Sequence, residues 1–190
     1  MVINFLANKF FDVENDDPSI RAQWIRYYIE VFVSGLSKTL EVFIMSSILG
    51  VLPLTFVAYL SFCVIRTAAF GWHALSSFYC SFQSILFFAI VPFLIEGIEL
   101  SNFLKDILIV SFLIILLIYA PQYTEINDQL DKYENTQMKK IVIFRGIILS
   151  FILHFSSGNF ALSVSIAMSI QILMLLPITK KIIQGKRVVL

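Results

Sequence analysis

The chain has 190 residues, of which 58% are hydrophobic and only 14% are charged. A soluble domain carries roughly a quarter charged residues, so this composition excludes an ordinary soluble protein and indicates a membrane protein. The formal net charge of +1 gives no electrostatic basis for binding nucleic acid, and two cysteines do not make a disulfide framework.

Residues 1–30 are predicted to form a cytoplasmic, amphipathic region at the membrane interface. Val2, Phe5 and Leu6 fall on one face of a short helix. A break at 15–19 precedes a second helix, whose aromatic and basic residues are typical of the headgroup region. Because this region lacks the long apolar run of a signal peptide, we expect it to remain on the mature chain.

After this region come several apolar segments, and most approach the roughly 20 residues that a membrane span needs. Lys38 and Glu41 interrupt the first segment, and the second is too short to cross alone as a straight helix. Residues 31–65 therefore form either two full spans or a bent, re-entrant pair. The sequence predicts an all-α membrane protein with about six transmembrane helices, in a polytopic domain at 31–178 followed by a basic cytoplasmic tail at 179–190. The six segments are 31–51, 53–65, 82–98, 103–120, 141–157 and 160–178.

The positions of the basic residues give this arrangement an orientation. With the amino terminus in the cytoplasm, 13 of the 14 Lys and Arg residues fall on or near the inner side, and only Lys105 falls outside. Such a bias is the positive-inside pattern of a multi-pass protein of the cell membrane. This orientation places both termini and the loop at 66–81 in the cytoplasm. The inner residues are Lys9, Arg21, Arg26, Lys38, Arg66, Lys132, Lys139, Lys140, Arg145, Lys180, Lys181, Lys186 and Arg187.

The loop at 66–81 contains a histidine and a cysteine, His73 and Cys80. An imidazole can take the proton of a thiol and leave a nucleophilic thiolate. On a straight helix, seven residues would separate the two by about 10.5 Å along the axis, far more than the roughly 3 Å of a hydrogen bond. A catalytic pair therefore requires an irregular loop, or two separate elements.

Four further residues fit supporting roles around this pair. Arg66 would stabilise a thiolate, or bind an oxyanion or carboxylate of a substrate. Gly71 offers a place for the chain to bend. Because 61–95 contains no Asp, Glu or Asn, the candidates to orient the imidazole are Ser77, Gln83, a backbone carbonyl or a residue from elsewhere in the fold.

The same residue types also have structural explanations. Buried cysteines are commonly small apolar fillers, which is our interpretation of Cys63 and an open alternative for Cys80. Arg66 is equally explained as an inner-face anchor, and His154 as a hydrogen-bonded structural histidine. The sequence contains no zinc-ligand spacing and no glycine-rich phosphate loop, so we expect no metal and no cofactor.

The pattern Arg-x6-His-x6-Cys, with Gly two residues before the His and Ala after it, resembles the AgrB (accessory gene regulator B) family. The segments "GWHALSSFYC", "QSILFFAIVPFL", "YAP" at Tyr119 to Pro121 and "LLPI" at Leu175 to Ile178 follow in the family's order. The resemblance covers nearly the whole chain. It departs from the family at Phe70-Gly71-Trp72, and in a loop after "YAP" that is less basic than in related chains.

The resemblance implies a membrane cysteine endopeptidase of Gram-positive quorum sensing, with Cys80 as the nucleophile and His73 as its general base. The substrate would be a short amphipathic AgrD-like propeptide, bound at the inner face of the membrane, that loses its carboxy-terminal part. The peptide would be held as an acyl-thioester and released as a macrocyclic thiolactone or lactone. The propeptide and the lipid membrane are the expected partners, nucleic acid is not, and a homodimer is left open.

Two rival functions remain at this point. A small peptide permease or exporter would carry ionisable residues that face each other within the spans, for which Lys38, Glu41 and His154 are the candidates. A noncatalytic membrane scaffold would keep its function when Cys80 is replaced by Ala.

Overall fold

The computed structural model describes residues 20–69, 77–121, 132–177 and 179. Every element in these ranges is a helix, and several are apolar enough to cross a membrane, which confirms the predicted all-α membrane class. The chain divides into two compact units, Met1–Val42 and Phe43–Leu190. The packing described below is that of the second unit.

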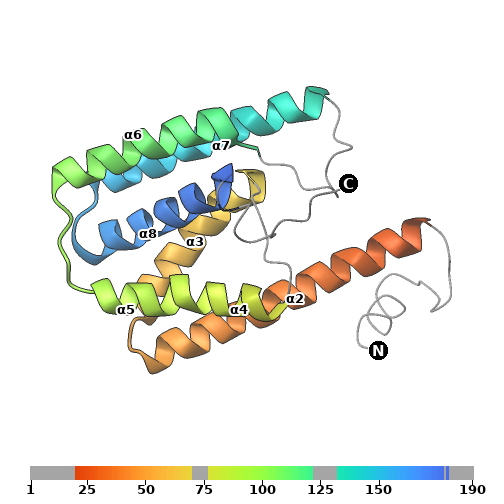
Figure 1. The fold of residues 1–190 in the computed structure, drawn as a ribbon, viewed down its shortest axis with the longest axis horizontal. Helices are drawn as coiled ribbons and strands as arrows, with labels where there is room; N and C mark the ends of the chain where they lie inside the picture. Colours follow the sequence, from red (N-terminus) through yellow and green to blue (C-terminus); the bar gives the residue numbers. More distant parts are fainter. Residues whose placement is uncertain (1–19, 70–76, 122–131, 178, 180–190) are drawn as a thin grey trace. The chain divides into compact units, whose positions relative to one another are not determined.

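Figure 1 shows the helices in chain order. One of them is continuous through a π-helical turn, η1, that separates α4 from α5. The elements are α2 (Ile20–Ile48), α3 (Leu52–Ala69), α4 (Ser77–Ile85), η1 (Leu86–Ile90), α5 (Val91–Ile95), α6 (Asn102–Tyr119), α7 (Lys132–Phe155) and α8 (Gly158–Leu175).

Four helical stretches among the described residues are long and apolar enough to span a membrane. The segments predicted at 31–51 and 141–157 lie on α2 and α7, which are helical but are not among these four. Both carry charges: Lys38 and Glu41 on α2, and Lys139, Lys140 and Arg145 on α7. The four stretches are Leu52–Ala69, Phe78–Ile95, Asn102–Tyr119 and Gly158–Leu175.

The prediction that the second segment is too short to cross alone is wrong. Its helix does not stop before Arg66 but continues to Ala69, which gives α3 18 residues. Arg and Ala are good helix formers, so a charge at this position ends the apolar run without ending the helix. Pro53 is tolerated because it lies in the first turn, where its missing N–H has no helical partner.

The helix that carries the third predicted span also begins earlier than expected. α4 starts at Ser77, so Cys80 lies on a helix and not in an irregular loop. The segment "SFYCSF" contains no Gly or Pro, so nothing in it stops the helix before the apolar run. Of the predicted loop at 66–81, residues 66–69 and 77–81 are helical, and residues 70–76 lie outside the described residues.

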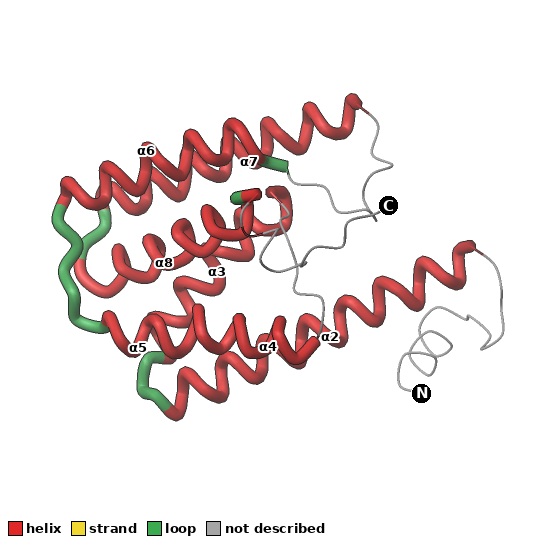
Figure 2. The backbone as a smooth tube through the Cα atoms, in the orientation of Figure 1, coloured by secondary structure: helices red, strands yellow, loops and turns green. Residues whose placement is uncertain are grey.

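Short turns join α2 to α3, α5 to α6 and α7 to α8 (Figure 2). Gly50, before α3, and Gly97, before α6, have φ values of +79° and +78°, in the left-handed region that glycine adopts most readily. Lys105 Nζ donates a 2.6 Å hydrogen bond to the Ser156 carbonyl. The α5–α6 and α7–α8 turns therefore lie at the same end of the bundle.

α8 is the central helix of the bundle. Of its residues 61% are buried, against 17% for α6, and it packs against α3, α6 and α7. Its small buried residues, including Ala161, Ser163 and Ala167, let neighbouring backbones approach closely, as is usual in membrane helix packing. The shared core consists of Ile65, Ala68, Ala69, Phe112, Leu116, Ala120, Val142, Leu149, Leu153, Ala161, Val164, Met168 and Leu175.

Candidate functional site

Cys80 lies in the first turn of α4, where its side chain is partly buried. Its carbonyl accepts a 2.9 Å hydrogen bond from Ser84 Oγ, one turn further along the helix. The first turn of a helix presents unpaired amides and the positive end of the helix dipole, which favour an anion. Cys80 lies at this end of α4.

Arg66, in the last turn of α3, brings a positive charge to this thiol. Its guanidinium is close enough to Cys80 for the two side chains to interact electrostatically. The guanidinium carbon lies 5.9 Å from the centre of the Phe62 ring, within the range of a cation–π contact. The structure thus brings together two of the predicted site residues from consecutive helices.

Gln83 lies one turn after Cys80 on α4 and links this helix to the carboxyl end of α8. Its Nε2 donates a 3.7 Å hydrogen bond to Met174 Sδ. Residues three apart share a helix face, so Cys80 and Gln83 point the same way. Met174 is therefore a neighbour of the site that the sequence did not reveal, although it directly precedes the "LLPI" segment.

For three of the predicted site residues the structure describes no side chain. Gly71 and His73 lie outside the described residues, and Ser77 is known only as the first residue of α4. The pairing of His73 with Cys80 therefore stays a prediction.

A second arginine, Arg145, contacts α3 from α7, a helix far from α3 in the sequence. Arg145 Nη1, on α7, donates hydrogen bonds of 2.8 Å to the Val64 carbonyl and 2.7 Å to Thr67 Oγ1. Both acceptors flank Arg66 in the last turns of α3. From the sequence, Arg145 was predicted only as one of the inner-face charges. Its position within an otherwise apolar stretch of α7 was the signal that its guanidinium needs a hydrogen-bond acceptor on another helix.

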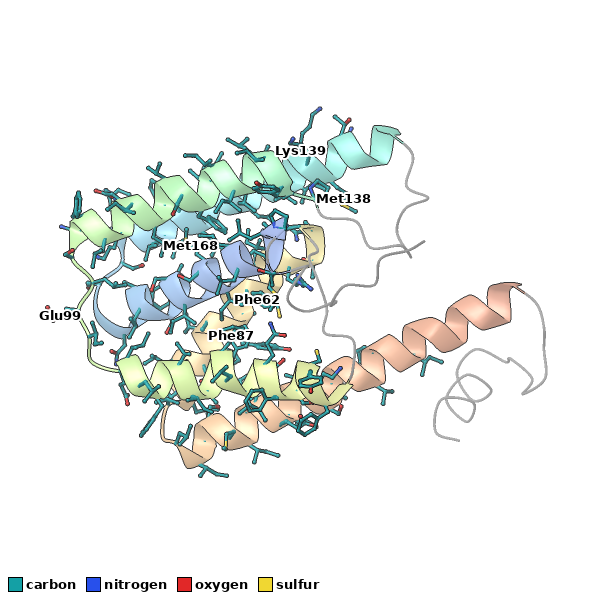
Figure 3. All side chains as sticks on the ribbon, in the orientation of Figure 1. Phe62, Phe87, Glu99, Met138, Lys139 and Met168 are labelled. Atoms are coloured by element: carbon teal, nitrogen blue, oxygen red, sulfur yellow. The ribbon has the colours of Figure 1, made fainter. Side chains whose placement is uncertain are left out.

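Aromatic rings fill the contact between α3 and η1, beside Phe62. The rings of Tyr59 and Phe62 lie 5.3 Å and 5.2 Å from that of Phe88 and meet it edge to face. Figure 3 labels Phe62 on α3 and Phe87 on the neighbouring turn. Cys63 is partly buried in this region and is hydrogen-bonded to Tyr59.

The polar groups at the other end of the bundle form a separate cluster. His154 Nδ1, on α7, lies 3.2 Å from Asp106 Oδ1, on α6, and both side chains are more than half exposed. His154 therefore has the hydrogen-bond partner expected of a structural histidine. The described residues contain no group of three or more His, Cys, Asp and Glu side chains that could hold a metal ion.

Comparison with known proteins shows which family the chain resembles. The family model "Accessory gene regulator B" matches residues 1–175. The chain is 32% identical to protein FsrB of Enterococcus faecalis over 187 residues, which cover 97% of this chain and 77% of that protein. It is 30% identical to accessory gene regulator protein B of Staphylococcus aureus (strain JH9), covering 93% of this chain and 97% of that protein. No solved structure gives a significant match.

Proposed function

Because the chain belongs to the Accessory gene regulator B family, which acts in quorum sensing, we propose that it is a membrane-embedded cysteine endopeptidase that processes an AgrD-like propeptide. The observation that carries the proposal is the placement of the Cys80 thiol at the start of α4, with the Arg66 guanidinium of α3 beside it. A helix amino terminus and a fixed cation are two of the features that make a cysteine nucleophilic.

The first half of the proposed reaction cuts the propeptide. His73 takes the proton of Cys80, and the thiolate attacks the carbonyl carbon of the scissile peptide bond. Arg66 stabilises the negative charge of the thiolate and of the tetrahedral oxyanion. When the carbon–nitrogen bond breaks, the amine of the carboxy-terminal fragment receives the proton from His73, and the remaining peptide is bound to Cys80 as a thioester.

The second half closes the ring. A Cys or Ser of the bound peptide attacks the thioester carbonyl, and His73 transfers the proton of this group to the departing Cys80 thiol. The product is a thiolactone or a lactone, and the enzyme returns to its starting state. An acyl-thioester keeps the group-transfer potential that this step needs, and a site poor in water protects it from hydrolysis.

Other predicted residues have supporting roles in this mechanism. Gly71 lets the chain bend between the helices, and Ser77 or Gln83 orients His73. Gln83 is held in place by its hydrogen bond to Met174. The region at 1–30 docks the amphipathic part of the propeptide, with both termini and the segment at 66–81 at the cytoplasmic face.

The permease alternative predicts ionisable residues that face each other within the spans. The pair His154–Asp106 joins two helices, but it lies at their ends: His154 is the last residue but one of α7, and Asp106 is in the second turn of α6. A path through the membrane needs such groups near the middle. The position of the pair therefore does not support the permease alternative.

The test is co-expression of the chain with candidate short propeptides, followed by mass spectrometry of the peptides. The wild-type chain and the Cys63→Ala variant should both yield a propeptide without its carboxy-terminal part. Cys80→Ala and His73→Ala should yield none. Cys63 provides the matched control because it is the only other cysteine and packs beside Tyr59. Normal processing by both Cys80→Ala and His73→Ala would falsify the peptidase proposal and favour a scaffold.

A further inference from the structure

Arg145 on α7 makes a network with the last turns of α3. Its Nη1 donates to the Val64 carbonyl at 2.8 Å and to Thr67 Oγ1 at 2.7 Å. Thr67 Oγ1 in turn donates to the Val64 carbonyl at 3.4 Å. One guanidinium nitrogen, one hydroxyl and one carbonyl are thus mutually bonded across two helices that are far apart in sequence.

The chemistry of these groups explains why they meet. A guanidinium cannot lose its charge in a protein, so within an apolar helix it must find acceptors. A carbonyl has two lone pairs and can accept a side-chain donor in addition to its helical N–H. Thr67 has an oxygen that accepts from Arg145 while its own hydrogen bonds to Val64. The last turns of α3 therefore satisfy the charge on α7.

The same network fixes the part of α3 that carries Arg66. Val64 and Thr67 precede and follow Arg66, and α3 ends at Ala69. The terminal turn of a helix has carbonyls without helical partners and frays more readily than its middle. A charged hydrogen bond from a neighbouring helix restrains this turn. The direction of the Arg66 side chain is set by that turn, and its guanidinium interacts with Cys80.

We propose that Arg145 is a positioning residue of the Cys80 site. It holds the last turn of α3 through Thr67 and Val64, so that the Arg66 guanidinium stays where it stabilises the Cys80 thiolate. Arg145 touches neither the thiol nor a substrate in this role. The proposal deepens the peptidase function and rests on it for its catalytic consequence, but its effect on thiol reactivity stands whether or not a propeptide is cleaved.

The test uses the full-length chain in detergent micelles, with Cys63→Ala in every protein so that Cys80 is the only cysteine. The first measurement is the rate at which iodoacetamide alkylates Cys80 at neutral pH. Arg66→Met should slow this reaction by about tenfold, because thiolate stabilisation by a neighbouring cation is lost. Arg145→Met and Thr67→Val should each slow it by about three- to tenfold through the displaced guanidinium. Arg145→Lys, which keeps the charge but not the planar fork, should give an intermediate rate.

Double variants separate positioning from general damage to the fold. If Arg145 acts through Arg66, adding Arg145→Met to Arg66→Met should slow alkylation no further, because coupled residues are not additive. Lys139→Met is the matched control, because Lys139 is an exposed cation on the same helix. In this variant Cys80 should be alkylated at the parent rate. The second measurement is propeptide cleavage, where Arg145→Met should lower kcat with little change in KM.

The outcomes decide the proposal directly. The proposal would be overturned if Cys80 is alkylated at the parent rate in both Arg145→Met and Thr67→Val while its alkylation is slow in Arg66→Met. Fully additive effects of Arg66→Met and Arg145→Met would also overturn it, since they show independent action. If the parent chain cleaves no propeptide but the alkylation rates follow the expected order, the peptidase function fails while the positioning role of Arg145 stands.

Discussion

The Thr55 hydroxyl on α3 donates a 2.6 Å hydrogen bond to the Phe88 carbonyl in η1. In a regular α-helix this carbonyl accepts from the residue four positions later, which here is Pro92 and has no N–H. The helix widens into a π turn before the proline, and a buried side chain of α3 supplies a donor from outside. The helical stretch that carries Cys80, α4 with η1, is thereby bonded to the helix that carries Arg66.

Replacing Thr55 by Val should therefore destabilise the bundle. The change keeps the shape of the side chain but removes the donor from a buried carbonyl, which costs about 1–3 kcal/mol. The free energy of unfolding, measured by titration with sodium dodecyl sulfate in mixed micelles, should fall by that amount. Thr39→Val is the control, because the Thr39 hydroxyl donates to the Gly35 carbonyl one turn earlier on α2, at 2.8 Å, and lies at a less buried position than Thr55. Equal losses in the two variants would contradict this account of η1.

Gly146 of α7 lies against the side chains of Leu116, Leu113 and Phe112 on α6. A Cβ added there would lie 2.5 Å from Leu116 Cδ1, and Leu116 is fully buried, so its side chain would have to shift within the packed core. Gly146→Ala should cost about 1–3 kcal/mol through overpacking. Gly35→Ala, on α2, should instead be neutral or stabilising by up to about 1 kcal/mol, because its added Cβ meets nothing within 4 Å. Unfolding titrations that rank the two alanine variants in the reverse order would show that the α6–α7 contact is looser than described.

The pair His154–Asp106 separates the peptidase from the permease. Each side chain is more than half exposed, and such ion pairs contribute only about 0–1 kcal/mol. Asp106→Asn and His154→Gln should thus change propeptide cleavage in membranes by less than about fivefold, which corresponds to the upper end of this energy. Loss of peptide release from cells by these variants, with cleavage intact, would instead assign the pair to transport.

Much of the fold could be predicted from the sequence, because apolar runs and the placement of Lys and Arg are local signals. The helix ends near the site could not: the charge at Arg66 resembles a boundary, yet α3 continues to Ala69, and the serines and aromatic residues before Phe82 resemble a loop, yet they begin α4. For the candidate site, the sequence indicated Arg66, Cys80 and Gln83. It did not reveal Met174 or Arg145, because their contacts with Gln83 and Thr67 join distant segments and depend on how the helices pack.

The orientation in the membrane can be tested with single cysteines in a chain that carries Cys63→Ala and Cys80→Ala. Glu99→Cys, at an exposed position in the α5–α6 turn, should react with a membrane-impermeant maleimide in intact cells. Asp128→Cys should react only after the cells are permeabilised, because the bias of Lys and Arg places its loop inside. Ready labelling of Asp128→Cys in intact cells would reverse the orientation and move Cys80 away from the face where a propeptide is made.

The central claim is that Cys80 forms a thioester with the propeptide, and its most direct test is the intact mass of the chain. We expect the chain purified after co-expression with its propeptide to carry an added mass equal to the amino-terminal peptide fragment. Hydroxylamine, which cleaves thioesters, should remove this mass, and peptide mapping should place it on Cys80. Cys63→Ala should retain the adduct and Cys80→Ala should lack it. A cleaved propeptide made by Cys80→Ala at the wild-type rate, with no adduct on any variant, would contradict the account.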